Sequence, residues 1–122
     1  MMSDDYRDRI IEYAHLKKGS ESSFPFDEVT EVFKVSGRIF MLVNNEEPFE
    51  ISLKCDPQRA VELRSMFGFI RPGYHLNKKN WITVSIDGSM DIGFYEELID
   101  HSYLQVVSKL TKAERAYLKD TD

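Results

Sequence analysis

The period of the hydrophobic residues changes to two near Val29, and this change constrains the fold more than any other feature of the sequence. Three runs rich in β-branched and aromatic residues follow, VTEVFKV, RIFMLV and FEISLK, separated by the turn signals SG and NNEEP. In the third run, apolar residues at 49, 51 and 53 alternate with polar residues at 50, 52 and 54. This alternation predicts an antiparallel meander with one buried face and one solvent-facing face.

Helical patterns stand before and after these strands. Residues 4–18 carry apolar side chains at helical spacing, and CDPQRAVELRSMF begins a helix with Asp56 as its N-cap and Pro57 at the first helical position. After a further strand, WITVSI, the chain ends in two helical segments. This order of elements predicts a single α+β domain over residues 1–122, with helices packed on one face of a largely antiparallel sheet. The buried face of the middle helix is expected to hold Ala60, Leu63, Met66 and Phe67.

Two connecting segments carry further expectations. GSESSFPF is predicted to be a loop, with Phe24 and Phe26 tucked beneath the domain. Residues 74–76 are expected to be extended and to pair with WITVS, so that NKKN forms the exposed tip of a hairpin.

The length and composition exclude several classes of protein. A chain of 122 residues can bury one modest core without a disulfide, and the lone Cys55 has no partner for one. With no basic-then-apolar leader, we expect a cytoplasmic protein. The longest uncharged apolar run, residues 39–43, is far short of the roughly 20 residues of a membrane helix, so we expect no membrane association. We also expect a monomer without a cofactor.

Charge is unevenly spread along the chain. The net charge is -5, but residues 1–53, 54–81 and 82–122 contribute -5, +4 and -4 respectively. An acidic protein does not bind nucleic acid indiscriminately, because its summed field opposes association. Any such binding is therefore expected to be weak and to use the middle of the chain.

The segment RPGYHLNKKNWITV lies at the end of this basic region. Lys78 and Lys79 at a hairpin tip can contact phosphates, Asn77 and Asn80 can contact phosphates or base edges, and the aromatic side chains can stack on bases. The structural interpretation is that asparagine favours turns, lysine solubilises the tip, and a lone tryptophan packs at the edge of the core.

Other chemistry has weaker support in the sequence. Cys55 precedes a helix, where a thiolate is stabilised, but Asp56 beside it opposes ionisation, which favours a buried structural thiol. His15, His75 and His101 do not have metal-ligand spacing. No nucleophile elbow, phosphate loop or catalytic grouping is present, so we expect no enzymatic activity. Three carboxylates recur every four residues on the first helix, at Asp4, Asp8 and Glu12.

Four stretches, taken in order, resemble the MmcQ/YjbR family of small bacterial proteins: FPFDEVTEVFKVSGRIFMLV, ISLKCDP, RPGYHLNKKNWITV and LIDHSYLQVVSKL. The resemblance runs from Phe24 to Leu110, and PGYHLNKKNWITV is its most specific part. It implies a frataxin-like (CyaY-like) α+β sandwich, described as a double wing, and a DNA-binding role. The residues that it nominates for contact with nucleic acid are Arg71, His75, Asn77, Lys78, Lys79, Asn80 and Trp81, with Lys54 as an outlying cation.

Two other functions remain open. A protein-interaction module with no nucleic-acid role would use an exposed apolar patch. The fold that the resemblance implies also suggests a frataxin-like metal-binding role for the acidic ridge of Asp4, Asp8 and Glu12, although likeness of fold does not fix function.

Overall fold

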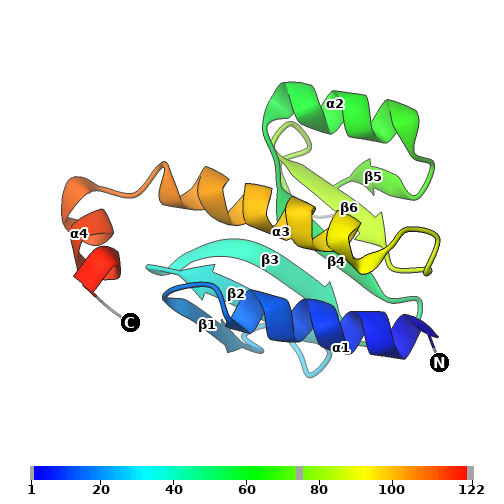
Figure 1. The fold of residues 1–122 in the computed structure, drawn as a ribbon, viewed down its shortest axis with the longest axis horizontal. Coiled ribbons are helices and arrows are strands. Elements are labelled where there is room, and N and C mark those ends of the chain that lie inside the picture. Colours follow the sequence, from blue (N-terminus) through cyan, green and yellow to red (C-terminus); the bar gives the residue numbers. More distant parts are fainter. Residues whose placement is uncertain (1, 74–75, 121–122) are drawn as a thin grey trace.

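The computed structural model of the protein describes residues 2–73 and 76–120. Within these residues, the chain forms four helices and six strands (Figure 1). In chain order they are α1 (Met2–His15), β1 (Ser20–Ser23), β2 (Thr30–Val35), β3 (Arg38–Asn44), β4 (Glu50–Lys54), α2 (Pro57–Met66), β5 (Ile70–Pro72), β6 (Trp81–Ser85), α3 (Ile92–Val107) and α4 (Lys112–Asp120).

All six strands join one antiparallel sheet in the order β1-β2-β3-β4-β6-β5. The three strands predicted from the period of two are β2, β3 and β4, and each is found within one residue of its predicted bounds. The α+β fold predicted from the sequence is therefore confirmed.

The helices α1, α2 and α3 lie on one face of this sheet (Figure 1). α3 packs against β2, β3 and β4, and α1 runs beside α3 (Figure 1). α2 covers β5 and β6, and Phe67 at its end contacts Phe94 of α3 with ring centroids 5.3 Å apart. The largest buried side chains between the layers are Tyr95, Phe33, Phe40, Ile10, Met41, Ile51 and Leu53. We call the opposite side of the sheet the open face; it carries the polar residues of β4.

A bulge in β3 fixes how the strands meet the helices. Phe33 pairs with Met41 and Lys34 pairs with Ile39, so Phe40 is an extra residue in β3. Both Phe40 and Met41 are fully buried as a result. The ring of Phe40 stands edge-on to Tyr103 of α3, with centroids 5.4 Å apart.

Ser102 of α3 connects two strands at this bulge. Its fully buried hydroxyl donates to the carbonyl oxygen of Phe40 at 2.5 Å and accepts from the backbone N–H of Lys54 at 2.8 Å. The last register pair of β3 and β4 is Met41 with Leu53, so both groups lie where strand pairing ends. The hydroxyl thus satisfies two backbone groups that the sheet itself leaves unpaired.

The sequence-based prediction was wrong at the N-terminal edge of the sheet. Ser20–Ser23 form the edge strand β1, which pairs with β2, and not a loop. Serine and glutamate have no strong strand preference, so the pairing depends on the backbone of β2 and leaves no periodic signal. Phe24 and Phe26 are 49% and 69% exposed, and so do not tuck beneath the domain.

Other boundaries also differ from expectation. The strand that pairs with β6 is Ile70–Pro72, whereas the strand predicted at residues 74–76 falls largely on residues 74 and 75, which lie outside the described residues. Of the four residues expected on the buried face of α2, Met66 is 69% exposed. α1 ends at His15, three residues before the predicted end, and Gly19 then turns the chain with φ at 73°.

Candidate functional site

The loop of residues 76–80 leads into β6 and is anchored at two of its residues. The carbonyl oxygen of Asn80 accepts from the N–H of Cys55 at 2.7 Å, and that of Lys78 accepts from the guanidinium of Arg64 at 3.3 Å. Before the loop, the N–H of Gly73 donates to the carbonyl oxygen of Trp81 at 3.0 Å. The loop is therefore held against the end of β4 and against α2.

The two asparagines of the loop have structural contacts. The side-chain oxygen of Asn77 accepts from the N–H of Lys79 at 2.9 Å, and the backbone carbonyl oxygen of Asn77 accepts from the N–H of Asn80 at 3.1 Å. Asn80 is half-buried, and its backbone connects the loop to Cys55. This is the turn-forming role of asparagine that the structural interpretation predicts.

The positive excess of residues 54–81 lies around this loop. Two of its six cations are paired: Arg59 with Glu97, and Arg71 with Glu50. None of the carboxylates in the described residues forms an ion pair with the remaining four. We call these four the basic cluster: Lys54, Arg64, Lys78 and Lys79.

The basic cluster only partly matches the predicted site. Lys54, Lys78 and Lys79 were predicted, and the side chains of the last two are exposed. Arg71 differs, because its guanidinium binds Glu50 and also contacts the Ser85 hydroxyl at 3.3 Å. Arg64 was not predicted; its only signal was its place in a basic stretch, since its contact with the loop depends on how α2 folds back. His75 lies outside the described residues.

Trp81 lies beside Lys54 on the open face. The two residues are register partners at the end of β4 and β6, and Trp81 is half-buried. The backbone at Gly73 passes close to Trp81, because a Cβ added to Gly73 would lie 2.5 Å from the Cβ of Trp81. Trp81 is thus fixed by the backbone of the preceding segment, with part of its surface exposed.

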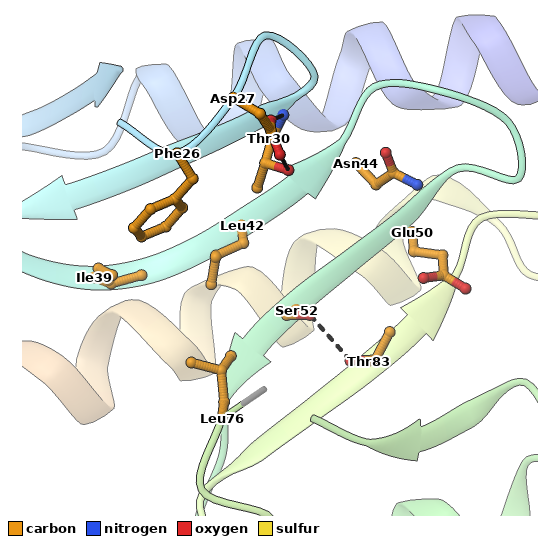
Figure 2. Close-up of a pocket in the computed structure, with 10 residues that line it drawn as sticks. All are labelled: Phe26, Asp27, Thr30, Ile39, Leu42, Asn44, Glu50, Ser52, Leu76 and Thr83. Atoms are coloured by element: carbon orange, nitrogen blue, oxygen red, sulfur yellow. Dashed lines mark hydrogen bonds between the residues drawn. The ribbon is translucent and has the colours of Figure 1, made fainter. Parts of the chain in front are cut away.

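The open face also carries a cavity of about 620 Å³ (Figure 2). Its apolar lining residues are Phe26, Ile39, Leu42 and Leu76. Phe26 and Leu76 come from segments on opposite sides of β3 and β4, as Figure 2 shows. The cavity therefore has the sheet as its floor and a loop side chain on each side.

Polar groups line the rest of the cavity. The hydroxyls of Ser52 and Thr83 lie 3.0 Å apart on the floor, and Asn44 and Glu50 stand at one end (Figure 2). Asp27 accepts hydrogen bonds from the N–H groups of Thr30, at 2.7 Å, and Val29, at 3.0 Å. These bonds, led by that of Thr30, lower the pKa of the Asp27 carboxyl. Asp27 therefore shapes the loop that carries Phe26.

Cys55 is a buried thiol at the junction of β4 and α2. Burial raises its pKa to about 11, so the thiol stays protonated near neutral pH. The next residue, Asp56, caps α2 by accepting from the N–H of Arg59, as predicted. Its own N–H donates to Nε2 of His101 at 3.1 Å. Burial, followed by the charge of Arg59, lowers the pKa of His101 and favours the neutral imidazole that this bond needs.

The acidic ridge of α1 offers little for a metal ion. Asp8 forms an ion pair with Arg7 at 2.9 Å, and the side chain of Asp4 lies outside the described part of the chain. Among the described residues, His, Cys, Asp and Glu side chains do not gather in a group of three that could hold a metal. None of the helices described is both long and apolar enough to cross a membrane.

A protein-family model described as YjbR matches residues 14–105, which hold α1's last residues, the whole sheet and most of α3. The chain belongs to the YjbR family. This match confirms the resemblance inferred from the motifs.

Relatives in the YjbR family cover most of the chain. It is 36% identical to the uncharacterised protein YjbR of Escherichia coli K12 over 110 residues, which are 89% of this chain and 93% of the relative. It is 38% identical to the uncharacterised protein YbdF of Escherichia coli O157:H7 over 97 residues, 78% and 79% of the two chains.

Solved structures agree with this fold. Protein DR2400 of Deinococcus radiodurans, described as a DUF419 domain, superposes with a TM-score of 0.86 at 42% identity, covering 92% of this chain and 86% of that one. A protein from Pseudomonas syringae superposes with a TM-score of 0.70 at 26% identity, covering 81% and 97%.

The structure explains two of the YjbR-like motifs as one structural unit. SLKCDP and HSY, nearly fifty residues apart, meet where Lys54 and Asp56 donate their N–H groups to Ser102 and His101. Tyr103 completes the unit, since its hydroxyl donates to the carbonyl oxygen of Lys18. These motif residues hold α3 on the sheet, whereas the third motif, PGYHLNKKNWITV, supplies the loop and Trp81.

Proposed function

We propose that this YjbR-family protein has no enzymatic activity and binds nucleic acid weakly through the basic cluster. The observation that carries the proposal is the set of four cations around one anchored loop that have no carboxylate partner among the described residues. Lysine ammonium groups contact phosphates as point charges, and a cation without an internal partner loses no ion pair when it does so.

The rest of the molecule sets the strength of this binding. With a net charge of -5, the summed field opposes a polyanion, and only a few phosphates can be neutralised at one loop. Affinity for DNA is expected in the non-specific range of about 10⁻⁴ to 10⁻⁶ M. The protonated, buried thiol of Cys55 supports a role without nucleophilic catalysis.

A second candidate is a protein-interaction module. It is favoured by the exposed apolar side chains of Phe24 and Phe26, the second of which lines the cavity on the open face. Exposed aromatic side chains are enriched at protein interfaces. The experiment below separates this candidate from nucleic-acid binding.

The test is fluorescence anisotropy of labelled duplex and single-stranded DNA at low salt, with wild type and Lys78→Glu/Lys79→Glu. The matched control is Lys109→Glu/Lys112→Glu, which changes the net charge by the same amount at exposed lysines near the junction of α3 and α4. Circular dichroism and thermal unfolding confirm that both variants fold.

The proposal expects saturable binding that the loop variant abolishes and that the control variant weakens only slightly. An equal loss of affinity in both variants would show that net charge alone governs binding, and would reject the basic cluster as the binding site. No binding at high micromolar protein would reject a nucleic-acid role and leave the protein-interaction module as the function to pursue.

A further inference from the structure

The side chains of the open face form three rows across the central strands, and the rows differ in chemistry. The register aligns Asn44 with Glu50, and Leu42 with Ser52 and Thr83. Lys54 and Trp81 form the third row, two residues further along β4 and β6. A carboxylate and an amide thus stand at one end, apolar and hydroxyl groups lie in the middle, and a cation lies at the other end.

The spacing of these rows is set by strand geometry. Alternate residues of a strand lie on the same face, about 7 Å apart. Lys54 therefore lies about 7 Å from Ser52 on the floor of the cavity, and Glu50 lies about as far on the other side. The cavity of about 620 Å³ falls within the size range of small-ligand pockets.

We infer that the cavity on the open face receives one unpaired base of a single-stranded nucleic acid, whose phosphates contact the basic cluster. The inference rests on the proposed function and adds the class of nucleic acid and a pocket for its base. An unpaired base has two apolar faces and a polar edge, which need apolar walls and hydrogen-bonding groups in one cavity.

The lining meets these requirements. Phe26 can stack on a base, and Leu42 and Leu76 supply further apolar surface (Figure 2). The amide of Asn44 can donate and accept at a base edge, and the carboxylate of Glu50, which also binds Arg71, can accept from an N–H of that edge, such as N3–H of thymine.

Charge complementarity favours this occupant over a peptide. A nucleotide is anionic at its phosphate end and uncharged with N–H donors at its base end, which matches Lys54 at one end of the cavity and Glu50 and Asn44 at the opposite end. A duplex cannot use the cavity, because its bases are stacked and paired. Single strands are therefore expected to bind more tightly than duplexes of equal length.

The test compares two labelled single strands that differ only in their bases: an oligothymidylate and an abasic strand of the same length. Each is titrated against wild type, Phe26→Ala and Phe24→Ala. Phe24 is the matched control, since it is an exposed phenylalanine of the same loop that does not line the cavity. Both substitutions remove exposed rings, so the fold is retained.

Wild type is expected to bind the oligothymidylate roughly five-fold or more tightly than the abasic strand, as base stacking on one aromatic ring predicts. Phe26→Ala is expected to remove that difference and to leave the abasic strand unaffected, and Phe24→Ala is expected to retain it. In methyl NMR spectra, the resonances of Leu42 and Ile39 should shift with the oligothymidylate only.

Other results would overturn the inference. Equal affinity for both strands, abolished by Lys78→Glu/Lys79→Glu, would retain the basic cluster but exclude the base pocket. Tight binding of the oligothymidylate without shifts at the cavity methyls would leave the cavity to another ligand class, such as a peptide. No binding of either strand would reject the proposed function, and the base pocket with it.

Discussion

The single buried hydroxyl of Ser102 makes two hydrogen bonds, which connect α3 to the ends of β3 and β4. Replacing Ser102 by alanine would leave the carbonyl oxygen of Phe40 and the N–H of Lys54 without their partner. Each buried group that loses its partner costs about 1–3 kcal/mol, so Ser102→Ala is expected to lower the free energy of unfolding by about 2–6 kcal/mol. Urea unfolding measures this change as a lower midpoint at unchanged slope.

Ser108 provides the control for this prediction. It is an exposed serine just after the same helix, and its hydroxyl donates to the carbonyl oxygen of Gln105. Ser108→Ala is expected to change the free energy of unfolding by no more than about 0.5 kcal/mol. Similar effects of the two substitutions would contradict the role assigned to Ser102.

At the residue scale, sequence reasoning found the local roles and missed the distant ones. Asp56 was correctly predicted as an N-cap, because its partner is the N–H of Arg59, three residues away. Ser102 lies in one of the two helical segments predicted at the end of the chain, but its two hydrogen-bond partners are 48 and 62 residues distant. Only the fold brings such groups together, so spacing along the chain carries no signal for them.

Among the elements, the β5–β6 hairpin depends on one glycine. A Cβ at position 73 would lie 2.5 Å from the Cβ of Trp81 and 3.2 Å from its carbonyl carbon. The backbone atoms cannot move aside without disturbing the bond between Gly73 and Trp81. Gly73→Ala is therefore expected to lower the free energy of unfolding by about 1–3 kcal/mol, as overpacking does elsewhere.

Thermal or urea unfolding of Gly73→Ala tests this, with Gly68→Ala as the comparison. An added Cβ at Gly68 would meet no described atom within 4 Å. A Gly73→Ala variant as stable as Gly68→Ala would show that the segment can shift without cost. Trp81 fluorescence should also change in the first variant alone.

Elements with strong periodicity were predictable, and those without it were not. β2, β3 and β4 carry alternating or continuous apolar residues, and α2 has a proline and an N-cap at its start. β1 has the sequence SESS and β5 has three residues with a proline, so neither has a strand signature. The cavity was not predicted either. Phe26 and Leu76 are distant in the sequence, and only the folding of the sheet places both beside the same cavity.

For the whole molecule, the uneven charge predicts a specific salt dependence. The logarithm of the DNA association constant falls with the logarithm of salt concentration by about 0.9 per phosphate neutralised on a duplex. Because the basic cluster has four cations, the slope for duplex DNA is expected to be no steeper than about -4. Lys78→Ala/Lys79→Ala, which removes two of the four cations without reversing their charge, should make it shallower by about 2. Anisotropy titrations over a salt series measure the slope, and a much steeper value would require contacts outside this cluster.

Both edges of the sheet are poor templates for another strand. β1 is four residues long with an outward carboxylate at Glu21, and β5 is three residues long and ends in Pro72, which has no N–H to donate. Short, charged or proline-bearing edges are how natural sheets avoid growing by edge-to-edge pairing. The sheet therefore resists lengthening into aggregates at high concentration, and a partner must approach over its face.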